Sequence, residues 1–461
     1  MADKYDTVVI GTGQAGTPLA GRAAAAGWRV AIVERHLVGG TCVNAGCIPT
    51  KALVASARAV HMARRGGEFG FGLPGDPVVN MARVKERMKR ISGSSNAGVQ
   101  KWIDSMDGVE LIRGHAVLDG PNRVLVGDRI LETDRIFINV GARPNIPDLP
   151  GVDEVDFLTS TSIMELEEVP EHLVVIGGSY IGLEFAQIHR RFGAKVTVIE
   201  QGPRLVHRED PDVSAAVQEI LESEGIQVRL NAECIGFSAH PDGIAVDVEC
   251  AEDPSPTVGS HLLLAVGRIP NTHDLGLDTT DVQIDERGII GVDDQLRTSV
   301  RGIWALGDCN GRGAFTHTAY NDYEIVAANL FDDDPRRVSD RIPCYALYID
   351  PPLGRVGMTE AQARESGRNV LVGTREMRHV GRAKERSETA GFMKFLVDAD
   401  TEELLGGSVL GINGDEVIHS VLDVMYAGVP FTTISRVVHI HPTVAELVPT
   451  TLQDLHPLEN P

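Results

Sequence analysis

The sequence predicts an α/β protein in which two units of parallel sheet are combined with a C-terminal α+β domain. Near the N-terminus a strand, a glycine-rich turn, a helix and a second strand ending on an acidic residue follow one another, and this order recurs from residue 173. From about Arg341 such turns disappear, and alternating strands over 391–397 and 406–411 precede a helix over 415–427. The length of 461 residues suits about three domains of roughly 150 residues each.

Composition excludes several classes of function. The chain has 43 lysine and arginine residues against 65 aspartate and glutamate residues, a formal net charge of −22. This charge opposes binding to nucleic acid or anionic membranes, because both attract cationic side chains. No apolar run reaches the roughly 18 residues of a spanning helix. The start, Met-Ala-Asp-Lys-Tyr-Asp, is unlike a signal peptide. We therefore expect a cytoplasmic protein that binds neither nucleic acid nor membrane.

The six cysteines are too few for a secreted disulfide framework. Four are scattered, and we expect them to be small, half-buried hydrophobic residues: Cys234, Cys250, Cys309 and Cys344. Cys42 and Cys47 differ, because they lie five residues apart in a glycine-rich segment.

The first 34 residues contain every part of a dinucleotide-binding unit in order. These parts are a strand over 7–10, the turn Gly11-Thr-Gly13-Gln-Ala-Gly16, a helix over about 18–26 and a strand over 28–33 ending at Glu34. Gly11 permits the tight turn, Gly13 lets the backbone approach a pyrophosphate, and Gly16 lets helix and strand pack closely. Glu34 can accept hydrogen bonds from ribose hydroxyls. A GxGxxG motif alone is weak, but five elements in register predict a Rossmann-like dinucleotide-binding domain.

A second unit repeats this design. It consists of a strand over 173–176, the turn Gly177-Gly-Ser179-Tyr-Ile-Gly182, a helix over 183–192 and a strand over 195–199 ending at Glu200. The first glycine and the acid are 23 residues apart in both copies. Ser179 replaces the middle glycine, and we expect a slightly looser pyrophosphate approach. Two dinucleotide sites in one chain indicate two different nucleotides and electron transfer between them.

Three further strands end in glycine-containing turns. Segments 134–144 and 261–270 each run into a turn, at Gly141 and Gly267, and segment 302–308 ends on Gly307-Asp308. An acidic residue just after a strand can bind sugar hydroxyls or simply form a turn. Spacing alone does not separate these two readings.

The segment Gly39-Gly-Thr41-Cys42-Val-Asn-Ala-Gly-Cys47-Ile-Pro-Thr-Lys51 is the most informative in the chain. A regular helix would raise the second cysteine by about 7.5 Å, whereas a disulfide needs Cα atoms within roughly 7 Å. If the pair closes, the backbone between must be distorted, which Asn44 and Gly46 permit. Pro49 favours a helix start, where Cys47 would be stabilised as a thiolate. A redox-active pair is the main reading. Zinc, its rival, needs further ligands, and none lie nearby in sequence.

With these motifs in order, the chain resembles the class I pyridine nucleotide-disulfide oxidoreductases, the family of dihydrolipoamide dehydrogenase, glutathione reductase and mercuric reductase. The resemblance covers essentially the whole chain, and the Gly-Gly-Thr-Cys-x4-Cys-x-Pro-x-Lys motif is highly specific. It implies FAD on the first fingerprint, with Glu34 on the adenosine ribose and Gly307-Asp308 at the ribitol of the flavin. It also implies an FAD-binding domain over 1–150 and 271–340, an NAD(P)-binding domain over 151–270 and a homodimerisation domain over 341–461.

The same resemblance implies roles around the cysteines. Cys47 would be the thiolate in charge transfer with the flavin, and Cys42 the thiol that attacks substrate. Lys51 would approach the flavin and pair with Glu184, while Tyr180 would gate the nicotinamide pocket. Further cofactor contacts are implied at Thr41, Gly141, Gly267, Gly177, Ser179, Gly182 and Glu200.

His441 and Glu446 resemble the acid–base dyad of this family, contributed by the other subunit. Physically, Glu446 would orient the imidazole and raise its basicity, so that His441 could take the proton of Cys42. A His-Pro-Thr segment near a terminus is otherwise more often a turn. No resident metal site is predicted.

The sequence leaves the final electron acceptor open. The chain ends without the terminal cysteine pair of mercuric reductase, yet Thr50 and segment 348–360 look more like the mercuric-reductase-like branch than lipoamide dehydrogenase. Our leading hypothesis is that NAD(P)H reduces FAD, FAD reduces Cys42–Cys47, and the dithiol reduces a small disulfide-type acceptor. Alternatives are reduction of thiol-bound Hg(II) or Cu(II) or of quinones, and a non-catalytic flavin redox sensor, which the intact dyad disfavours.

The choice of nicotinamide nucleotide depends on Glu200. A carboxylate at this strand end binds a 2′-hydroxyl and repels a 2′-phosphate, which favours NADH. Arg204 and Arg208 are the opposing signal, because either could reach a phosphate. NADPH therefore stays possible.

Overall fold

The strand before the first fingerprint lies at the centre of a five-stranded parallel sheet. In the computed structural model, which describes residues 2–248 and 255–459, this sheet has the order β18-β8-β2-β3-β4. Its strands are β2 (Thr7–Ile10), β3 (Val30–Glu34), β4 (Val109–Arg113), β8 (Ile136–Ile138) and β18 (Ile303–Ala305). All of β2 is buried, as expected for a β-branched run. β18 reaches this sheet only after the chain has completed the second unit.

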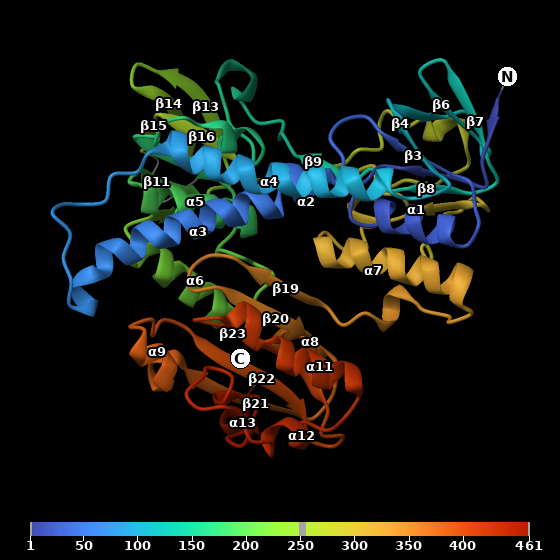
Figure 1. Cartoon of the computed structure of the whole chain (residues 1–461). Coiled ribbons are helices and arrows are strands. Elements are labelled where there is room, and N and C mark those ends of the chain that lie inside the picture. The colour runs from blue at the N-terminus through green and yellow to red at the C-terminus, as the bar shows by residue number, and fades with distance from the viewer. Residues whose placement is uncertain (1, 249–254, 460–461) are drawn as a thin grey trace.

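Two helices cover this sheet, α1 (Gly16–Ala25) and α7 (Thr316–Ala327). α1 begins at the last glycine of the fingerprint, two residues before the predicted start. A four-stranded sheet lies beside the parallel one (Figure 1). It contains β1 (Asp3–Lys4), β5 (Ala116–Leu118), β6 (Arg123–Val126) and β7 (Arg129–Glu132).

The second fingerprint follows the same plan. Its parallel sheet has the order β12-β11-β10-β16 and is built from β10 (His172–Ile176), β11 (Lys195–Ile199), β12 (Gln227–Arg229) and β16 (His261–Leu264). Its helices are α5 (Tyr180–Phe192) and α6 (Pro211–Ser223). An antiparallel sheet of β13 (Ile235–His240), β14 (Gly243–Val248) and β15 (Thr257–Gly259) adjoins it, and β9 (Ala142–Pro144) pairs with β17 (Arg268–Pro270).

The helices after the first unit connect it to the second. After α2 (Gly40–Asn44), the long helices α3 (Cys47–Arg64) and α4 (Met81–Asp104) lie side by side, and α3 packs on α5 (Figure 1). Leu53 of α3 and Leu183 of α5 belong to one hydrophobic core. This packing holds the first turn of α3 against the first turns of α5.

The C-terminal region is a six-stranded antiparallel sheet with helices, in the order β19-β20-β23-β22-β21-β24. Its strands are β19 (Cys344–Leu347), β20 (Leu353–Gly357), β21 (Val370–Glu376), β22 (Phe392–Asp398), β23 (Leu404–Leu410) and β24 (His456–Pro457). Its helices are α8 (Glu360–Glu365), α9 (Gly381–Glu385), α10 (Gly414–Val417), α11 (His419–Ala427), α12 (Thr432–Ser435) and α13 (Leu447–Leu452).

The predicted single helix over 415–427 is wrong in detail, because α10 and α11 are separated at Ile418. Ile418 is 4% exposed and packs closely over Gly354 of β20. The break between the helices thus falls at a residue whose side chain is buried against the sheet.

The scattered cysteines differ from expectation at one position. Cys309 is buried and Cys344 half-buried, as expected. Cys234 is exposed and disulfide-bonded, so its assignment as a half-buried hydrophobic residue is wrong. It lies in a surface loop before β13, where its sulfur cannot join the core. Cys250 lies outside the described residues. Within the described ranges, no helix has both the length and the apolar character needed to cross a membrane.

Candidate active site

The three glycines of the first fingerprint lie at positions that have no room for a side chain. A Cβ on Gly11, whose φ is +103°, would lie 2.3 Å from the Asn139 carbonyl oxygen, and one on Gly16 would lie 2.1 Å from the Gly11 oxygen. Asn139 is the residue that holds this turn. Its Oδ1 accepts a hydrogen bond from the Gly16 N–H (2.9 Å), and its Nδ2 donates to the Leu306 oxygen (2.9 Å). A Cβ on Gly13 would meet the same Oδ1 at 2.8 Å.

Glu34 lies at the end of β3, next to the fingerprint. Its Oε2 accepts hydrogen bonds from the Thr12 N–H (3.1 Å) and hydroxyl (2.6 Å), and its Oε1 accepts from the His36 N–H (2.8 Å). These contacts fix the carboxylate at the strand end, the position from which it can meet a ribose.

Two of the three further predicted turns have open space at their glycines. Gly141 and Gly267 have φ of +63° and +100°, and a Cβ on either would meet no atom within 4 Å. Asp308 is the second residue of the turn Gly307–Asn310 after β18, and its Oδ2 lies 3.8 Å from Arg268 Nε. Burial raises the pKa of Asp308 and lowers that of Arg268. The carboxylate of Asp308 is half-buried and lies beyond hydrogen-bond distance of Arg268, so it can accept hydrogen bonds from a ligand hydroxyl.

The second fingerprint has the same close approaches. A Cβ on Gly177, whose φ is +112°, would lie 2.5 Å from the Ala265 oxygen, and one on Gly182 would lie 2.1 Å from the Gly177 oxygen. Glu200 accepts hydrogen bonds from the N–H groups of Gly178 (2.6 Å) and Gly202 (2.8 Å). Ser179 is the N-cap residue of α5, so the helix begins immediately after it.

The two predicted redox cysteines lie on either side of a break between helices. Cys42 is in α2, and Cys47 is the first residue of α3. The distortion lies at Ala45 (φ −147°, ψ 21°) and Gly46 (φ −138°, ψ −117°), so Gly46 is used as expected and Ala45 replaces Asn44. Beside the pair, the exposed Thr41 follows Gly40, whose Cβ would lie 2.9 Å from the Gly13 Cα. The start of α2, two residues before Cys42, therefore lies against the first fingerprint.

The two thiols are chemically unequal. A hydrogen bond with Cys42, together with contacts from Thr316 and Lys51 and against the opposing effect of burial, lowers the pKa of Cys47 to about 6. The same hydrogen bond and burial raise the pKa of Cys42. At neutral pH, Cys47 is the thiolate and Cys42 the neutral thiol.

Thr316 is a functional residue that sequence reasoning missed. Its Oγ1 lies 3.0 Å from Cys47 Sγ, and it is the first residue of α7. The N-termini of α3 and α7 therefore meet at one sulfur atom, which favours the thiolate. Nothing local in the sequence marks Thr316. Sequence reasoning also missed Asn139. Its position could have been noticed, because it is a polar residue directly after the buried strand β8.

Lys51 and Glu184 form the predicted pair. Lys51 Nζ lies 2.7 Å from Glu184 Oε2, and Glu184 is 5% exposed. The Tyr348 N–H donates to Glu184 Oε1 (3.1 Å), and Lys51 Nζ lies 4.5 Å from the centre of the Tyr348 ring. Lys51 is one helical turn beyond Cys47, so the ion pair holds the cysteine helix to α5.

Tyr180 is the first residue of α5 and lies in an aromatic cluster. Its ring is perpendicular to those of Phe315 (6.1 Å between centroids) and Tyr345 (5.6 Å). Phe315 immediately precedes Thr316, so Tyr180 lies between the second fingerprint and the cysteine site.

His441 and Glu446 lie together on the C-terminal domain. His441 Nδ1 is 2.9 Å from Glu446 Oε2, and the His441 side chain is 80% exposed. Across the described ranges, no hydrogen bond or ion pair joins this dyad to Cys42 or Cys47 of the same chain. The fold thus forms the dyad but does not bring it to the cysteines within one subunit.

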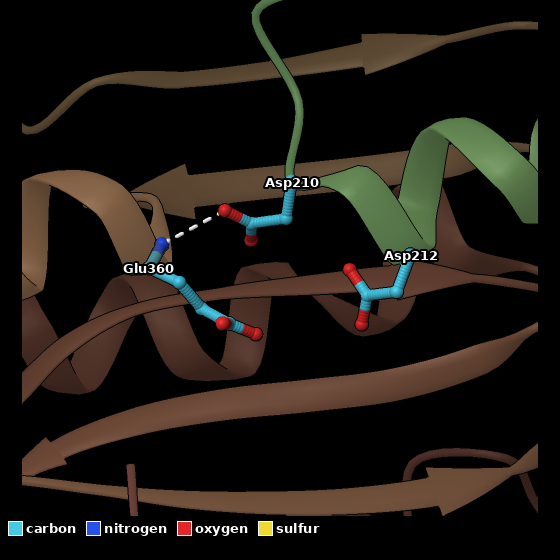
Figure 2. A group of neighbouring side chains, drawn as sticks. All are labelled: Asp210, Asp212 and Glu360. Carbon is cyan, nitrogen blue, oxygen red and sulfur yellow. Dashed lines mark hydrogen bonds between the residues drawn. The ribbon is translucent and has the colours of Figure 1, made fainter. Parts of the chain in front are cut away.

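A group of three carboxylates outside this site resembles a metal site. Figure 2 shows Asp210 and Asp212, at the start of α6, converging with Glu360 of α8. Lys394 Nζ lies among them, 2.5 Å from Glu360 Oε1, 2.8 Å from both Asp212 oxygens and 3.2 Å from Asp210 Oδ2. The ammonium group therefore supplies the positive charge that a metal ion would bring.

Two family models match the chain. One, described as pyridine nucleotide-disulphide oxidoreductase, covers residues 5–322, and the other, described as the dimerisation domain of that family, covers residues 344–452.

Curated relatives match over nearly the whole length. The chain is 37% identical over 452 residues to the probable pyridine nucleotide-disulfide oxidoreductase RclA of Escherichia coli, covering 96% of this chain and 98% of the relative. It is 34% identical to the dihydrolipoyl dehydrogenase of Thermus scotoductus (98% and 97% covered). It is 33% identical to the mercuric reductase of Streptomyces lividans (96% and 94% covered).

Solved structures agree with these matches. The structure of the HOCl-induced flavoprotein disulfide reductase RclA from Escherichia coli superposes with a TM-score of 0.89 at 34% identity, covering 97% of this chain and 99% of that one. A Cu(II) complex of the same protein gives a TM-score of 0.88, with the same identity and coverage.

Proposed function

The chain belongs to the pyridine nucleotide-disulphide oxidoreductase family, and we propose that it carries electrons from NADH through FAD to the Cys42–Cys47 pair and on to a small disulfide-type acceptor. Family membership implies an enzyme that uses FAD and NAD(P)H. We propose three further points: the preference for NADH, the roles of individual residues and the identity of the acceptor.

The first unit fits FAD. The glycine turn at Gly11 and Gly13 has no space for a Cβ, so its backbone is free to approach a pyrophosphate. Glu34 is fixed at the end of β3 for the adenosine ribose, and half-buried Asp308 can accept hydrogen bonds from the ribitol hydroxyls. Bound FAD supplies two-electron transfer between nicotinamide and disulfide. Lys51, held by Glu184, contributes a fixed positive charge beside the cysteines.

The proposal rests on one observation: the pKa of Cys47 is lowered, whereas that of Cys42 is raised. Cys47, with a pKa lowered to about 6, is the sulfur that exists as an anion at neutral pH. Cys42 keeps its proton and lies in α2, on the N-terminal side of the break between α2 and α3. A thiol that attacks an acceptor disulfide must lose that proton, so it needs a base.

The dyad of His441 and Glu446 supplies the base in the second subunit of a homodimer. Glu446 binds Nδ1 of His441, which leaves Nε2 to take the proton of Cys42. Val438 and Ile440, beside His441, are 100% and 81% exposed in the single chain. Apolar side chains so exposed next to a catalytic base are consistent with a partner surface that covers them.

The test is anaerobic steady-state oxidation of NADH by the FAD-loaded protein with a panel of acceptors. We expect turnover with lipoamide or another low-molecular-weight disulfide, and loss of that turnover in Cys42→Ser. Turnover with quinone alone, retained in Cys42→Ser, would contradict the proposed path.

Thiol-bound Cu(II) is a second candidate acceptor. It is favoured by the Cu(II) complex of the related RclA and by the thiolate sulfur of the Cys42–Cys47 pair, a soft ligand suited to the Cu(I) that reduction would form. Metal reduction needs no proton transfer through His441, so Cu(II)-dependent NADH oxidation that survives in His441→Ala would support this candidate over the disulfide.

A further inference from the structure

The histidine of the dyad lies in an exposed stretch of the C-terminal domain. The His441 side chain is 80% exposed, and Val438 and Ile440 beside it are 100% and 81% exposed. Across the described ranges, the imidazole forms hydrogen bonds only with Glu446. A base that transfers a proton must lie within hydrogen-bond reach of its partner, so the backbone at this position has to be fixed by other groups.

A guanidinium from a different helix holds the backbone next to His441. Arg382, in α9, donates two hydrogen bonds to the carbonyl oxygen of Pro442, from Nε (3.1 Å) and from Nη2 (2.6 Å). Its third nitrogen, Nη1, lies 3.3 Å from Glu385 Oε2 on the same helix. Because the planar guanidinium presents its donors in a fixed fork, this contact sets both the direction and the distance of the Pro442 carbonyl.

The helix that carries Arg382 is firmly anchored. Val380 and Ala383, on either side of Arg382 in sequence, are completely buried. They belong to the same hydrophobic core as Val444 and Val448, which follow the dyad histidine. The core therefore holds α9 and this part of the chain together, and Arg382 extends the attachment to the exposed residues just before Val444.

The other contacts of this stretch are local. The Thr443 hydroxyl donates to the Ile440 oxygen (2.8 Å) and accepts from the Glu446 N–H (3.2 Å), which shapes the turn without joining it to another element. In the part of the chain that the structure describes, Arg382 is the one residue from before α12 that forms a hydrogen bond with residues 436–446.

We propose that Arg382 is a positioning residue for the acid–base dyad. By holding the Pro442 carbonyl, it fixes the angle at which His441 is presented to the partner subunit's Cys42. Arg382 acts through His441 and takes no proton itself. A displacement of about 1 Å at a reacting group can cost about 10²-fold in rate, so loss of this anchor should slow the disulfide step without removing the base. The inference rests on the proposed function, because it presumes that the dyad serves the second subunit.

Arg382→Met removes the donors and keeps an unbranched side chain. Flavin reduction by NADH, measured by stopped flow on the FAD-loaded protein, should be unchanged, whereas steady-state turnover with lipoamide should fall about 10- to 100-fold, less than in His441→Ala. Arg378→Met is the matched control, because Arg378 lies four residues earlier, pairs with Glu376 and has a side chain that is 68% exposed. It should change neither rate.

Subunit exchange assigns Arg382 to one half of the shared site. In a mixed dimer of Arg382→Met and Cys42→Ser chains, one site combines the intact cysteine pair of the first chain with the intact arginine and dyad of the second. About half the dimers would be mixed, so activity should recover to about a quarter of the wild type. Such recovery requires that the Arg382→Met chain folds and carries a working cysteine site, which a merely structural defect would not allow.

The same variant mixed with His441→Ala should show no recovery above its own residual activity. In those mixed dimers no site holds an intact dyad together with Arg382, because both substitutions damage the same half of the site. Arg382 and His441 should therefore behave as one complementation group, and Cys42 as the other.

Four results would overturn the role of Arg382. These are full disulfide turnover in Arg382→Met, equal losses in Arg382→Met and Arg378→Met, a loss of flavin reduction that matches the loss of turnover, and recovery with His441→Ala. If Cys42→Ser and His441→Ala complement each other while Arg382→Met recovers with neither, only the role of Arg382 fails. Failure of Cys42→Ser and His441→Ala to complement under proven exchange would overturn the shared dyad, and this inference with it.

Discussion

The hydroxyl of Thr316 lies 3.0 Å from the sulfur of Cys47 and joins two helices that are distant in the chain. Cys47 begins α3 and Thr316 begins α7, so the positive ends of both helices face the same thiolate. Lys51 adds a third favourable charge from the next turn of α3. The low pKa of Cys47 is therefore a property of the tertiary structure as much as of the cysteine motif.

Thr316→Val should raise the pKa of Cys47. The wild-type thiolate forms as pH rises through about 6, and loss of one hydrogen bond to an anion should shift this midpoint upwards by roughly one unit. The pH titration of the thiolate-to-flavin charge-transfer absorbance in the reduced enzyme measures it. Thr316→Ser keeps the hydroxyl and should titrate as the wild type. An unchanged midpoint in the valine variant would show that Thr316 does not stabilise the thiolate.

The two cysteines should have opposite spectroscopic effects. Cys47→Ser removes the thiolate and should abolish the long-wavelength charge-transfer band on two-electron reduction. Cys42→Ser leaves Cys47 unable to form a disulfide, so the band should be present without reductant. Absorbance spectra of the purified variants test both expectations. Bands of wild-type intensity and redox behaviour in both variants would mean that the roles are wrongly assigned.

His441→Ala should separate the two halves of the reaction. Flavin reduction by NADH should remain nearly intact, because Cys47 and Lys51 are untouched, while disulfide turnover should fall by about 10²–10⁴, the usual worth of a positioned acid–base group. Stopped-flow reduction and steady-state turnover measure the two halves.

Mixed subunits test whether the dyad serves the partner. Under subunit exchange, Cys42→Ser and His441→Ala chains should form mixed dimers, each with one intact site. About half the dimers would be mixed, so activity should recover to about a quarter of the wild type, as expected for a two-fold symmetric dimer. A dyad acting within its own chain predicts no recovery, even when exchange is demonstrated by mass spectrometry.

Glu200 should make the enzyme prefer NADH. Its carboxylate is fixed by the N–H groups of Gly178 and Gly202, whereas Arg204 donates to the His207 carbonyl (3.0 Å). A 2′-phosphate would therefore meet a fixed negative charge. The ratio of kcat/KM for the two nucleotides tests this, with Arg204→Ala as the control that should leave the ratio unchanged. A preference of tenfold or more for NADPH would contradict the assignment.

Lys394→Met should destabilise the fold strongly. Its side chain is 3% exposed, and its ammonium group forms ion pairs with Asp210, Asp212 and Glu360. Removing it takes away the cation that the three carboxylates share and leaves buried Asp210 with Arg355 alone, and loss of one partner of a buried ion pair costs about 3–5 kcal/mol. Lys89→Met is the matched control, because Lys89 pairs with Glu165 at the surface and should cost less than about 1 kcal/mol. Urea denaturation measures both, and similar losses would refute the structural role of Lys394.

The sequence alone determined those features whose chemistry is local. Each fingerprint lies within one strand–turn–helix–strand unit, so Gly11, Gly16 and Glu34 can be assigned from spacing, and the strands β2 and β11 begin and end at the predicted residues. The cysteine motif likewise predicts a helix start at Cys47, because Pro49 and the glycines act on the adjacent backbone.

Only the tertiary structure decided which distant groups complete these motifs. Thr316 reaches Cys47, Asn139 fixes the first glycine turn, and Glu209 holds Tyr180 from a loop with no motif of its own. Hydrogen bonds and buried charges depend on distances of about 3 Å, which are set by how helices and sheets pack. No local sequence pattern predicts the distant partner of a threonine, asparagine or glutamate. The role of such a residue can be assigned only from the packing of the sheets and helices.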